Sequence, residues 1–363
     1  MCEITCDELG PAKVIQLYSP KEQLRAVVVV DNTALGPAIG GVRMSSRLTA
    51  EEVWRLARTM TLKNSIAGLP HGGAKAGIIA DPASPGKERR FRVFARMIRN
   101  LTEYIPGPDM GCDETAMAWI HDEIGRSVGL PEEIGGLPLD KVGATGYGLA
   151  ECAEVAASAA GLELKGARVA VQGFGSVGKA AARFLADKGA VLVAVADSQG
   201  TVHNPDGLDL PELVKVKRES GSVVKYSKGN ILPADAVIGI DCHILIPAAT
   251  PDVIHEGNAE TIKARLILQG ANIPATTGAE QILHERGILV VPDFIANAGG
   301  VIMAAMEYAG KAEQEAFTAI RERIRNNTRL ILEKMSTDQT LPRVAADALA
   351  QERVLRAMCY QDS

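Results

Sequence analysis

Residues 167–197 constrain the fold of this chain most strongly, because two apolar runs there enclose a glycine-rich turn. Residues 167–172 are typical of a buried strand, and Gly173-Phe-Gly-Ser-Val-Gly178 follows directly. A helical pattern through Phe184 comes next, and a second buried strand ends at Asp197. The glycine motif alone is weak evidence. Strand, turn, helix and strand in this order predict a βαβ unit of a doubly wound parallel sheet.

The three glycines of this motif have separate roles in such a fold. The first makes the turn, the second lets a pyrophosphate approach the backbone, and the third allows the helix to pack closely. A pyrophosphate would lie at the N-terminus of the helix, where backbone N–H groups point outward. The motif therefore predicts a Rossmann dinucleotide-binding domain whose cofactor contacts include Gly173, Gly175, Ser176, Val177, Gly178 and Asp197.

Asp197 bears on the choice of cofactor. A carboxylate at this position would accept hydrogen bonds from an adenosine ribose and would repel a 2′-phosphate. The following Ser198-Gln199-Gly200 offers no arginine to bind such a phosphate. The sequence thus favours NAD, with NADP as the alternative.

Three further strand patterns, at residues 236–240, 266–270 and 289–293, each lead into a loop. In a doubly wound sheet, ligands gather at the carboxyl ends of the strands, and Asn272 and Asn297 fall there. An asparagine at such a point can also be the N-cap of a helix, and Asn297 could do both.

The N-terminal third of the chain predicts a smaller α/β domain. Residues 13–18 and 24–30 are typical of paired strands, and Thr49-Ala-Glu-Glu52 is a capping box that begins a helix. Two more helices are expected at 90–101 and 114–124. Residues 129–143 are rich in Gly, Leu and Pro and indicate a linker. We therefore expect a substrate-binding and oligomerisation domain at 1–128 plus 339–363, and a dinucleotide-binding domain at 129–338.

The segment from Thr61 to Gly77 places Lys63 and Lys75 on either side of Leu69-Pro-His-Gly-Gly73. The glycine pair permits a turn that side chains would block, and it brings the backbone close to a bound molecule. A lysine in such a partly dry pocket can act as a base. An isolated Gly-Gly-x-Lys is more typical of a surface turn with solvated lysines. His71, beside the glycine pair, could line a pocket or simply pack.

Several motifs in the same order resemble the glutamate/leucine/phenylalanine/valine dehydrogenase family, over nearly the whole chain. Besides the lysine segment, they are Gly36-Pro-Ala-Ile-Gly-Gly-Val-Arg-Met44, Pro108-Asp-Met-Gly111, Ala144-Thr-Gly-Tyr-Gly148, Gly270-Ala-Asn272 and Asn297-Ala-Gly-Gly-Val301. One departure is Ala74, where the family usually has a third glycine.

The resemblance implies an NAD(P)-dependent enzyme that oxidatively and reversibly deaminates an L-amino acid to a 2-oxo acid and ammonia. It implies that Lys63 binds the substrate carboxylate, that Lys75 is the general base and that Asp109 transfers a proton to or from the amine. On local sequence alone, Asp109 would be a turn residue after Pro108. The resemblance adds Gly40 and Gly41 as substrate contacts, and Thr145, Ala271, Asn272 and Asn297 as cofactor contacts.

Two positions bear on the substrate side chain. Glutamate-specific members of the family carry a lysine where this chain has Ile39, and a serine where it has Ala304. The two residues therefore predict an apolar substrate such as leucine, valine or phenylalanine, unless another basic residue reaches the pocket. The alternative is glutamate, because the sequence around Lys63 and at 268–300 resembles that branch. A second alternative is a non-catalytic regulator that binds a nucleotide or an amino acid. The presence of Lys63, Lys75 and Asp109 argues against it.

Composition excludes other classes of function. The 363 residues carry a net charge of −5, which gives no electrostatic footprint for nucleic acid. The sequence has no apolar run of about 18 residues and no leader pattern at its start, so we expect a cytoplasmic protein that binds no membrane. The scattered cysteines and histidines predict reduced thiols and no metal site. By resemblance, the chain forms a homo-oligomer.

Overall fold

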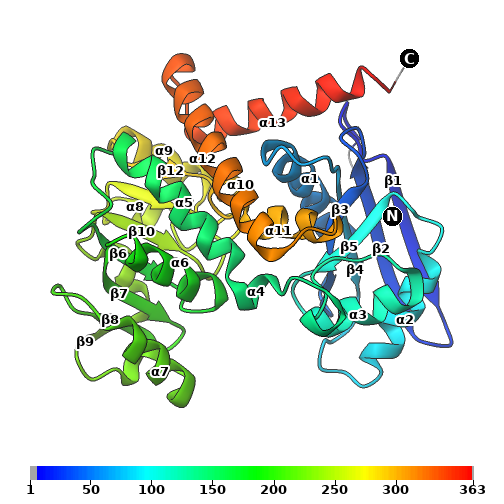
Figure 1. Ribbon diagram of the computed structural model, residues 1–363, viewed down its shortest axis with the longest axis horizontal. Helices are drawn as coiled ribbons and strands as arrows, with labels where there is room; N and C mark the ends of the chain where they lie inside the picture. The colour runs from blue at the N-terminus through cyan, green and yellow to red at the C-terminus, as the bar shows by residue number, and fades with distance from the viewer. Residues whose placement is uncertain (1–5, 362–363) are drawn as a thin grey trace. The chain divides into compact units, whose positions relative to one another are not determined.

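The computed structural model describes residues 6–361, so the first residues of the chain, with Cys2, lie outside the described part (Figure 1). The contacts divide the chain into two compact units. Unit 1 comprises residues 1–142, 301–316 and 347–363, and unit 2 comprises 143–300 and 317–346. These bounds differ from the expected ones, because the contacts assign residues 301–316 to unit 1 and place the first boundary at residue 142.

Unit 1 contains a mixed five-stranded sheet in the order β1-β2-β4-β3-β5. The strands are β1 (Lys13–Ser19), β2 (Leu24–Asn32), β3 (Ala38–Met44), β4 (Gly73–Ile78) and β5 (Tyr104–Pro108). The expected pairing of the first two strands is confirmed, and it is antiparallel. Strand β3 runs parallel to both of its neighbours, with Ile39 opposite Gly73 and Gly41 opposite Gly107.

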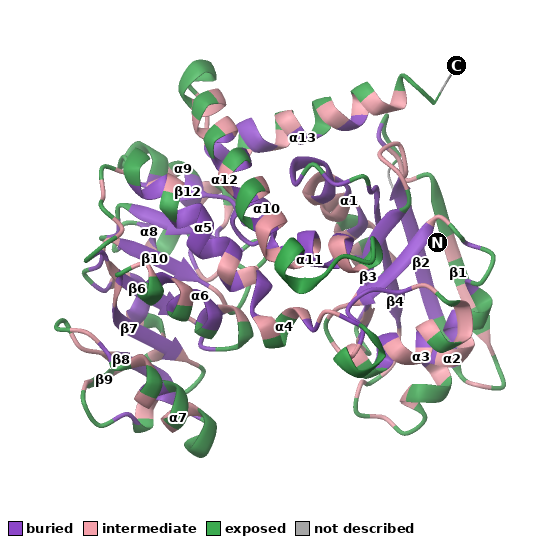
Figure 2. Cartoon of the chain, viewed as in Figure 1, coloured by how far each residue is buried: buried purple, intermediate pink, exposed green. Residues whose placement is uncertain are grey.

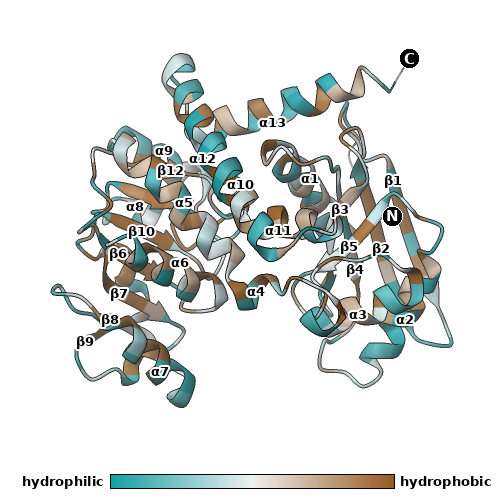
Figure 3. Ribbon diagram, viewed as in Figure 1, coloured by the Kyte–Doolittle hydropathy of each residue, from teal (hydrophilic) through white to brown (hydrophobic). Residues whose placement is uncertain are grey.

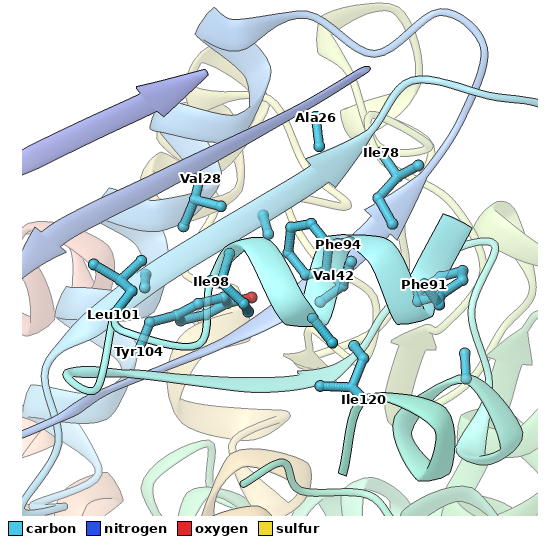
Figure 4. Packing of buried hydrophobic residues seen from close by; sticks show 14 of the residues in the cluster. Ala26, Val28, Val42, Ile78, Phe91, Phe94, Ile98, Leu101, Tyr104 and Ile120 are labelled. Atoms are coloured by element: carbon cyan, nitrogen blue, oxygen red, sulfur yellow. The ribbon is translucent and has the colours of Figure 1, made fainter. Parts of the chain in front are cut away.

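Helices cover both faces of this sheet. On one face, α2 (Lys87–Met97) and α3 (Glu114–Ile124) bury Phe91, Phe94 and Ile120 against strand residues such as Val42 (Figure 4). Burial of each such side chain contributes roughly 1.5–3 kcal/mol. On the other face lies α1 (Ala50–Ile66), packed on the valines of β2. The α1 helix begins as predicted, since the Thr49 side chain accepts a hydrogen bond from the Glu52 N–H.

Later segments of the chain complete unit 1. The α11 helix (Gly299–Tyr308) begins in unit 2 and continues in unit 1, where Glu307 accepts hydrogen bonds from the N–H groups of Gly129 and Leu130 at 2.8 and 3.0 Å. The last helix, α13 (Pro342–Met358), supplies Arg353, whose guanidinium donates to the carbonyl of Ile66 at 2.8 Å. Arg353 thereby satisfies a carbonyl at the end of α1.

Unit 2 contains a seven-stranded sheet in the order β12-β11-β10-β6-β7-β8-β9. The parallel strands are β6 (Arg168–Gln172), β7 (Val191–Asp197), β10 (Ile244–Pro247), β11 (Leu266–Leu268) and β12 (Leu289–Val291), and the antiparallel edge is β8 (Gly200–His203) and β9 (Asn230–Leu232). The strand order reverses between β6 and β10. The predicted fold class, an α/β domain plus a doubly wound Rossmann domain, is confirmed.

The helices of unit 2 pack on this sheet, whose parallel strands are mostly buried (Figure 2) and mostly hydrophobic (Figure 3). The longer ones are α5 (Ala144–Ala159), α6 (Ser176–Asp187), α7 (Leu210–Ser220), α9 (Thr277–Glu285) and α12 (Glu313–Asp338), the last of which begins in unit 1. The short ones are η2 (Val223–Lys225), η3 (Ala234–Gly239), α8 (Glu256–Ala259) and α10 (Asp293–Ala296). Within the described residues, no helix is both long enough and apolar enough to cross a membrane.

One local expectation was wrong. Residues 236–240 belong largely to the 3-10 helix η3, and the strand β10 was missed. A short apolar run cannot be assigned to strand or helix by periodicity alone, and η3 begins after Pro233 with only Val237 and Ile238 fully buried. The expected linker at 129–143 also contains two short helices, η1 (Glu132–Ile134) and α4 (Leu139–Val142).

Candidate active site

Lys75 and Asp109 meet at one edge of the unit 1 sheet. Lys75 lies within β4, and Asp109 directly follows β5. Because β3 pairs with both strands in parallel, the two side chains come together across it. The Lys75 Nζ lies 2.8 Å from the Asp109 Oδ2, and the two side chains are 9% and 18% exposed. The structure thus gives the predicted base and the predicted proton-transfer residue a direct, largely buried ion pair.

Arg43 also binds Asp109, and sequence reasoning assigned it no role. Its Nε and Nη2 donate to the two carboxylate oxygens at 3.1 and 3.4 Å, and its Nη1 donates to the Glu52 carboxylate at 2.7 Å. A planar guanidinium suits such forked contacts. Arg43 was quoted within the glycine-rich loop, and its position two residues after Gly41 on the same strand face was the available signal.

These two cations determine the ionisation of Asp109. Burial alone would raise the pKa of Asp109, but the charges of Lys75 and Arg43 outweigh it and lower the pKa to about 2. Asp109 is therefore a carboxylate at neutral pH. In this form it accepts hydrogen bonds, and it can take up a proton only if its contacts with the two cations weaken.

Gly41 lets the β3 backbone pack closely against the ion pair. A Cβ at this position would lie 2.8 Å from the Asp109 Cβ and 3.2 Å from the Lys75 Nζ. A Cβ at Gly40 would lie 1.7 Å from the Ala74 carbonyl oxygen, so this glycine permits close packing of two strands. Ala74 itself is fully buried in the core on the α2 side of the sheet, and an alanine there leaves the Lys75 face unchanged.

Lys63 lies in the last turn of α1, which is tied to the glycine pair. The adjacent Asn64 donates to the carbonyl oxygens of Gly72 at 2.7 Å and Ile39 at 3.4 Å. A Cβ at Gly73 would lie 2.0 Å from the backbone nitrogen of Thr61. The helix turn carrying Lys63 therefore packs directly on the segment that carries Lys75.

The two predicted side-chain determinants are both buried apolar residues of unit 1. Ile39 is 3% exposed and shares a strand face with Gly41. Ala304 is 5% exposed and lies on α11. That they contact the substrate side chain stays a prediction.

A cleft of about 1030 Å³ opens in unit 2 at the point where the strand order reverses. Ligands bind at such switch points in doubly wound sheets. The lining comes from the carboxyl ends of β6, β7 and β10 and from η3 and α8, and it includes Gly173, Phe174, Gly175, Asp197, Ser198, Lys217, Ala249, Thr250 and Asn258.

The glycines of the turn match what a dinucleotide needs there. Gly173 has a φ of +97°, and a Cβ on Gly178 would lie 1.9 Å from the Gly173 carbonyl oxygen. A Cβ on Gly175, in contrast, would meet no atom within 4 Å. The space beside Gly175, at the start of α6 with Ser176 and Val177, is therefore open to a pyrophosphate.

The Asp197 carboxylate makes several hydrogen bonds within the protein that the sequence does not predict. Its carboxylate accepts hydrogen bonds from Lys217 Nζ at 2.7 Å, Val223 N at 2.8 Å, Gln199 N at 2.9 Å and Ser222 Oγ at 3.1 Å. Burial raises the pKa of Asp197, but these donors outweigh it and the net shift is downward. The Asp197 charge is thus balanced by a lysine that also lines the cleft, and sequence reasoning missed this lysine.

The remaining predicted cofactor contacts lie together in unit 2. The Asn297 side-chain amide donates to the carbonyls of Gly270 and Ala271 at 3.3 Å and to the Asn272 side chain at 3.1 Å. Asn297 is the C-cap residue of α10. Thr145 packs near Gly300, where a Cβ would lie 3.0 Å from the Thr145 Oγ1. None of these four predicted contacts is among the residues that line the described cleft.

A doubly wound sheet with an open glycine turn, together with a buried lysine–aspartate pair on a second α/β unit, defines a nicotinamide-dependent dehydrogenase. Two family models match the chain: Glutamate/Leucine/Phenylalanine/Valine dehydrogenase over residues 135–362, and Glu/Leu/Phe/Val dehydrogenase, dimerisation domain over residues 11–126. The chain belongs to this family. It is an NAD(P)-dependent amino acid dehydrogenase acting on a CH–NH2 group.

Similar proteins of known sequence are glutamate dehydrogenases. The chain is 40% identical to glutamate dehydrogenase of Aeropyrum pernix over 352 residues, which covers 90% of this chain and 84% of the relative. It is 39% identical to the NADP-specific glutamate dehydrogenase of Saccharolobus shibatae over 351 residues, covering 90% and 82%.

Two solved structures show the same fold. The hetero-hexameric glutamate dehydrogenase from Thermus thermophilus, in a leucine-bound form, has a TM-score of 0.86 at 31% identity, covering 96% of this chain and 89% of the other. L-tryptophan dehydrogenase from Nostoc punctiforme has a TM-score of 0.76 at 26% identity, covering 97% and 98%. Similarity thus includes proteins named for both acidic and aromatic substrates.

Proposed function

We propose that this dehydrogenase acts on L-glutamate, and converts it reversibly to the 2-oxo acid and ammonia. The similarity to proteins named glutamate dehydrogenase supports this substrate. The apolar substrate expected from Ile39 and Ala304 has no support from these relatives. The observation that carries the chemistry is the 2.8 Å pair of Lys75 and Asp109 beneath Gly41.

In the proposed mechanism, three residues of unit 1 act on the α-carbon and its substituents. Lys63 binds the α-carboxylate through a charge-assisted hydrogen bond. Asp109, ionised at rest, accepts the proton of the substrate amine. When bound, the nicotinamide cofactor supplies the hydride acceptor. Oxidation of the amine leaves an imine carbon that a water molecule must attack.

Lys75 is the proposed base for that water. The Lys75 ammonium must first release its own proton to solvent, and the neutral amine then takes a proton from the water as the oxygen adds to the imine carbon. The amine nitrogen receives a proton from Asp109 and leaves as ammonia, while the new hydroxyl releases its proton and becomes the carbonyl of the 2-oxo acid. Lys75 and Asp109 already share a hydrogen bond, so protons can pass between them without rearrangement of the backbone. Burial of the pair excludes competing water.

We propose that the cleft of unit 2 accepts either NAD or NADP. The open space at Gly175 and the close packing at Gly178 suit the pyrophosphate of both. Asp197 by itself disfavours a 2′-phosphate, whereas Lys217, 2.7 Å from it, offers a cation for one. Self-association through unit 1 is a further proposal, supported by the dimerisation-domain model over residues 11–126. The cytoplasmic location stays a prediction.

An apolar amino acid is a second candidate substrate, because Ile39 and Ala304 are buried and offer no partner for a side-chain charge. The deciding experiment measures kcat/KM for glutamate, leucine, valine and phenylalanine, with NAD and with NADP. The reverse reaction is measured with the matching 2-oxo acids and ammonia. Highest kcat/KM for glutamate supports the proposal, and a clear preference for leucine, valine or phenylalanine overturns it in favour of the second candidate.

A further inference from the structure

His71 is a buried group that the mechanism above does not use. It is 5% exposed, and in the sequence it lies between Lys63 and Lys75, directly before the glycine pair. Its Nδ1 lies 2.9 Å from the carbonyl oxygen of Pro37. A carbonyl oxygen can only accept, so the Nδ1 carries the hydrogen. The Nε2 is therefore a lone-pair acceptor in the neutral ring and a donor only in the imidazolium.

The loop around His71 is held against the start of β3, the strand that carries Ile39. The Ile39 N–H donates to the Gly72 carbonyl at 3.2 Å, and the Gly72 N–H donates to the Gly36 carbonyl at 3.1 Å. Asn64, adjacent to Lys63, binds the same Gly72 carbonyl at 2.7 Å. The His71 ring is thus fixed beside the glycine-rich loop and beside the helix turn that presents Lys63.

A second contact links His71 to the helix that carries Ala304. The His71 and Tyr308 rings pack edge to face, with centroids 5.8 Å apart. Ala304 lies one turn before Tyr308 on α11, so the two residues share a helix face. His71 therefore contacts the helix that carries Ala304 and directly precedes a residue that is hydrogen-bonded to Ile39, and these are the two positions where the family's lysine and serine are missing.

We propose that His71 recognises the side-chain carboxylate of the substrate, as an imidazolium whose Nε2–H donates to that carboxylate while Nδ1–H donates to Pro37. This inference rests on the proposed glutamate substrate. A carboxylate in an apolar site needs a charged partner, and neither Ile39 nor Ala304 can provide one. The His71 imidazolium would supply this buried cation.

Binding of an acidic substrate then brings a proton with it. Burial lowers the pKa of His71, and the hydrogen bond to Pro37 opposes this only in part, so the ring is neutral at pH 7 before substrate binds. Tyr308 is the titratable group packed on the ring, and Arg126 interacts electrostatically with Tyr308. As the pH rises, the free energy needed to protonate His71 increases. Binding of glutamate requires this protonation and binding of leucine does not, so only glutamate loses affinity.

The test compares kcat/KM for glutamate and leucine between pH 6 and 9 in the parent, His71→Leu and His71→Gln. For the parent, the glutamate-to-leucine ratio should fall by about tenfold per pH unit above the His71 pKa. In His71→Leu the ratio at pH 7 should fall by at least about tenfold, and its pH dependence should disappear. His71→Gln keeps a donor for Pro37 and should give an intermediate ratio that does not change with pH. The matched control is His284→Leu, an exposed histidine of unit 2.

Proton uptake gives a second measurement that does not depend on turnover. Titration of 2-oxoglutarate into the NADH-bound enzyme, in buffers of different ionisation heat, should show uptake of up to one proton in the parent and none in His71→Gln. A parent that prefers glutamate while both His71 variants keep its ratio and pH slope overturns this inference alone. A parent that does not use glutamate overturns the inference and the proposed function together. If His71→Leu does not fold, His71→Gln decides.

Discussion

The Lys75 Nζ donates to the Asp109 Oδ2 across 2.8 Å, and Arg43 donates to both oxygens of the same carboxylate. The acid is thereby kept ionised and the lysine is kept beside it. Because neither cation is adjacent to Asp109 in sequence, three parallel-paired strand segments are needed to assemble this arrangement.

Replacement of Lys75 by alanine should leave a folded protein that still binds NADH but turns over at least about 10³-fold more slowly, since the general base is lost. Steady-state kinetics with NADH-binding fluorescence separate the two effects. Lys21→Ala, at an exposed position of unit 1, is the control. A Lys75→Ala variant that keeps a tenth of the parent rate would remove Lys75 from the role of base.

Arg43→Gln should move the acid limb of the kcat/KM profile to higher pH. Arg43 helps to lower the pKa of Asp109, so its loss raises that pKa toward the ordinary value for aspartate. The ionised form needed for proton acceptance then disappears at a higher pH as the solution is acidified. The control is Arg47→Gln, an exposed arginine that follows the same strand. An unchanged acid limb would mean that Asp109 ionisation does not limit the rate.

Gly175→Ala should weaken cofactor binding, whereas Gly178→Ala should lower the stability of the fold. At Gly175 a Cβ meets nothing within 4 Å, so the variant should keep its Tm but raise the KM for NAD and NADP. At Gly178 a Cβ would lie 1.9 Å from a carbonyl oxygen, so overpacking should cost roughly 1–3 kcal/mol and lower Tm. Calorimetry and cofactor titration distinguish them. Equal Tm losses in both variants would contradict the assignment of the open space to cofactor.

Lys217→Ala should lower kcat/KM with NADP by about tenfold more than with NAD, because it removes a cation and exposes the charge of Asp197. Lys215→Ala, exposed on the same helix, is the matched control. In the opposite direction, Asp197→Ser with a nearby arginine should favour NADP. If Lys217→Ala lowers kcat/KM equally with both cofactors, Lys217 does not discriminate between the 2′-hydroxyl of NAD and the 2′-phosphate of NADP.

Ile39→Lys combined with Ala304→Ser should raise the ratio of kcat/KM for glutamate over that for leucine. The new lysine supplies a buried cation for a side-chain carboxylate, and the serine supplies a donor. Each single variant is the control for the pair. No change in the ratio would show that these two positions do not face the substrate side chain.

Local signals in the sequence were sufficient for the βαβ unit at residues 167–197. The strand ending at Asp197 and the glycine turn at Gly173 were predicted, because a continuous apolar run and a glycine-rich strand-to-helix turn can be recognised within a few residues. The segments 236–240 and Ile244–Pro247 were not, because runs so short and apolar fit helix and strand equally well.

The sequence by itself determined the class of enzyme, through motifs whose glycines and lysines are needed at those spacings. Only the tertiary structure decided which charges meet. Arg43 reaches Asp109, Lys217 reaches Asp197 and His71 reaches Tyr308 only because the chain folds back on itself. Patterns along the chain carry information about neighbours in sequence, whereas the ionisation of a carboxylate or an imidazole depends on burial and on charges brought close by the fold.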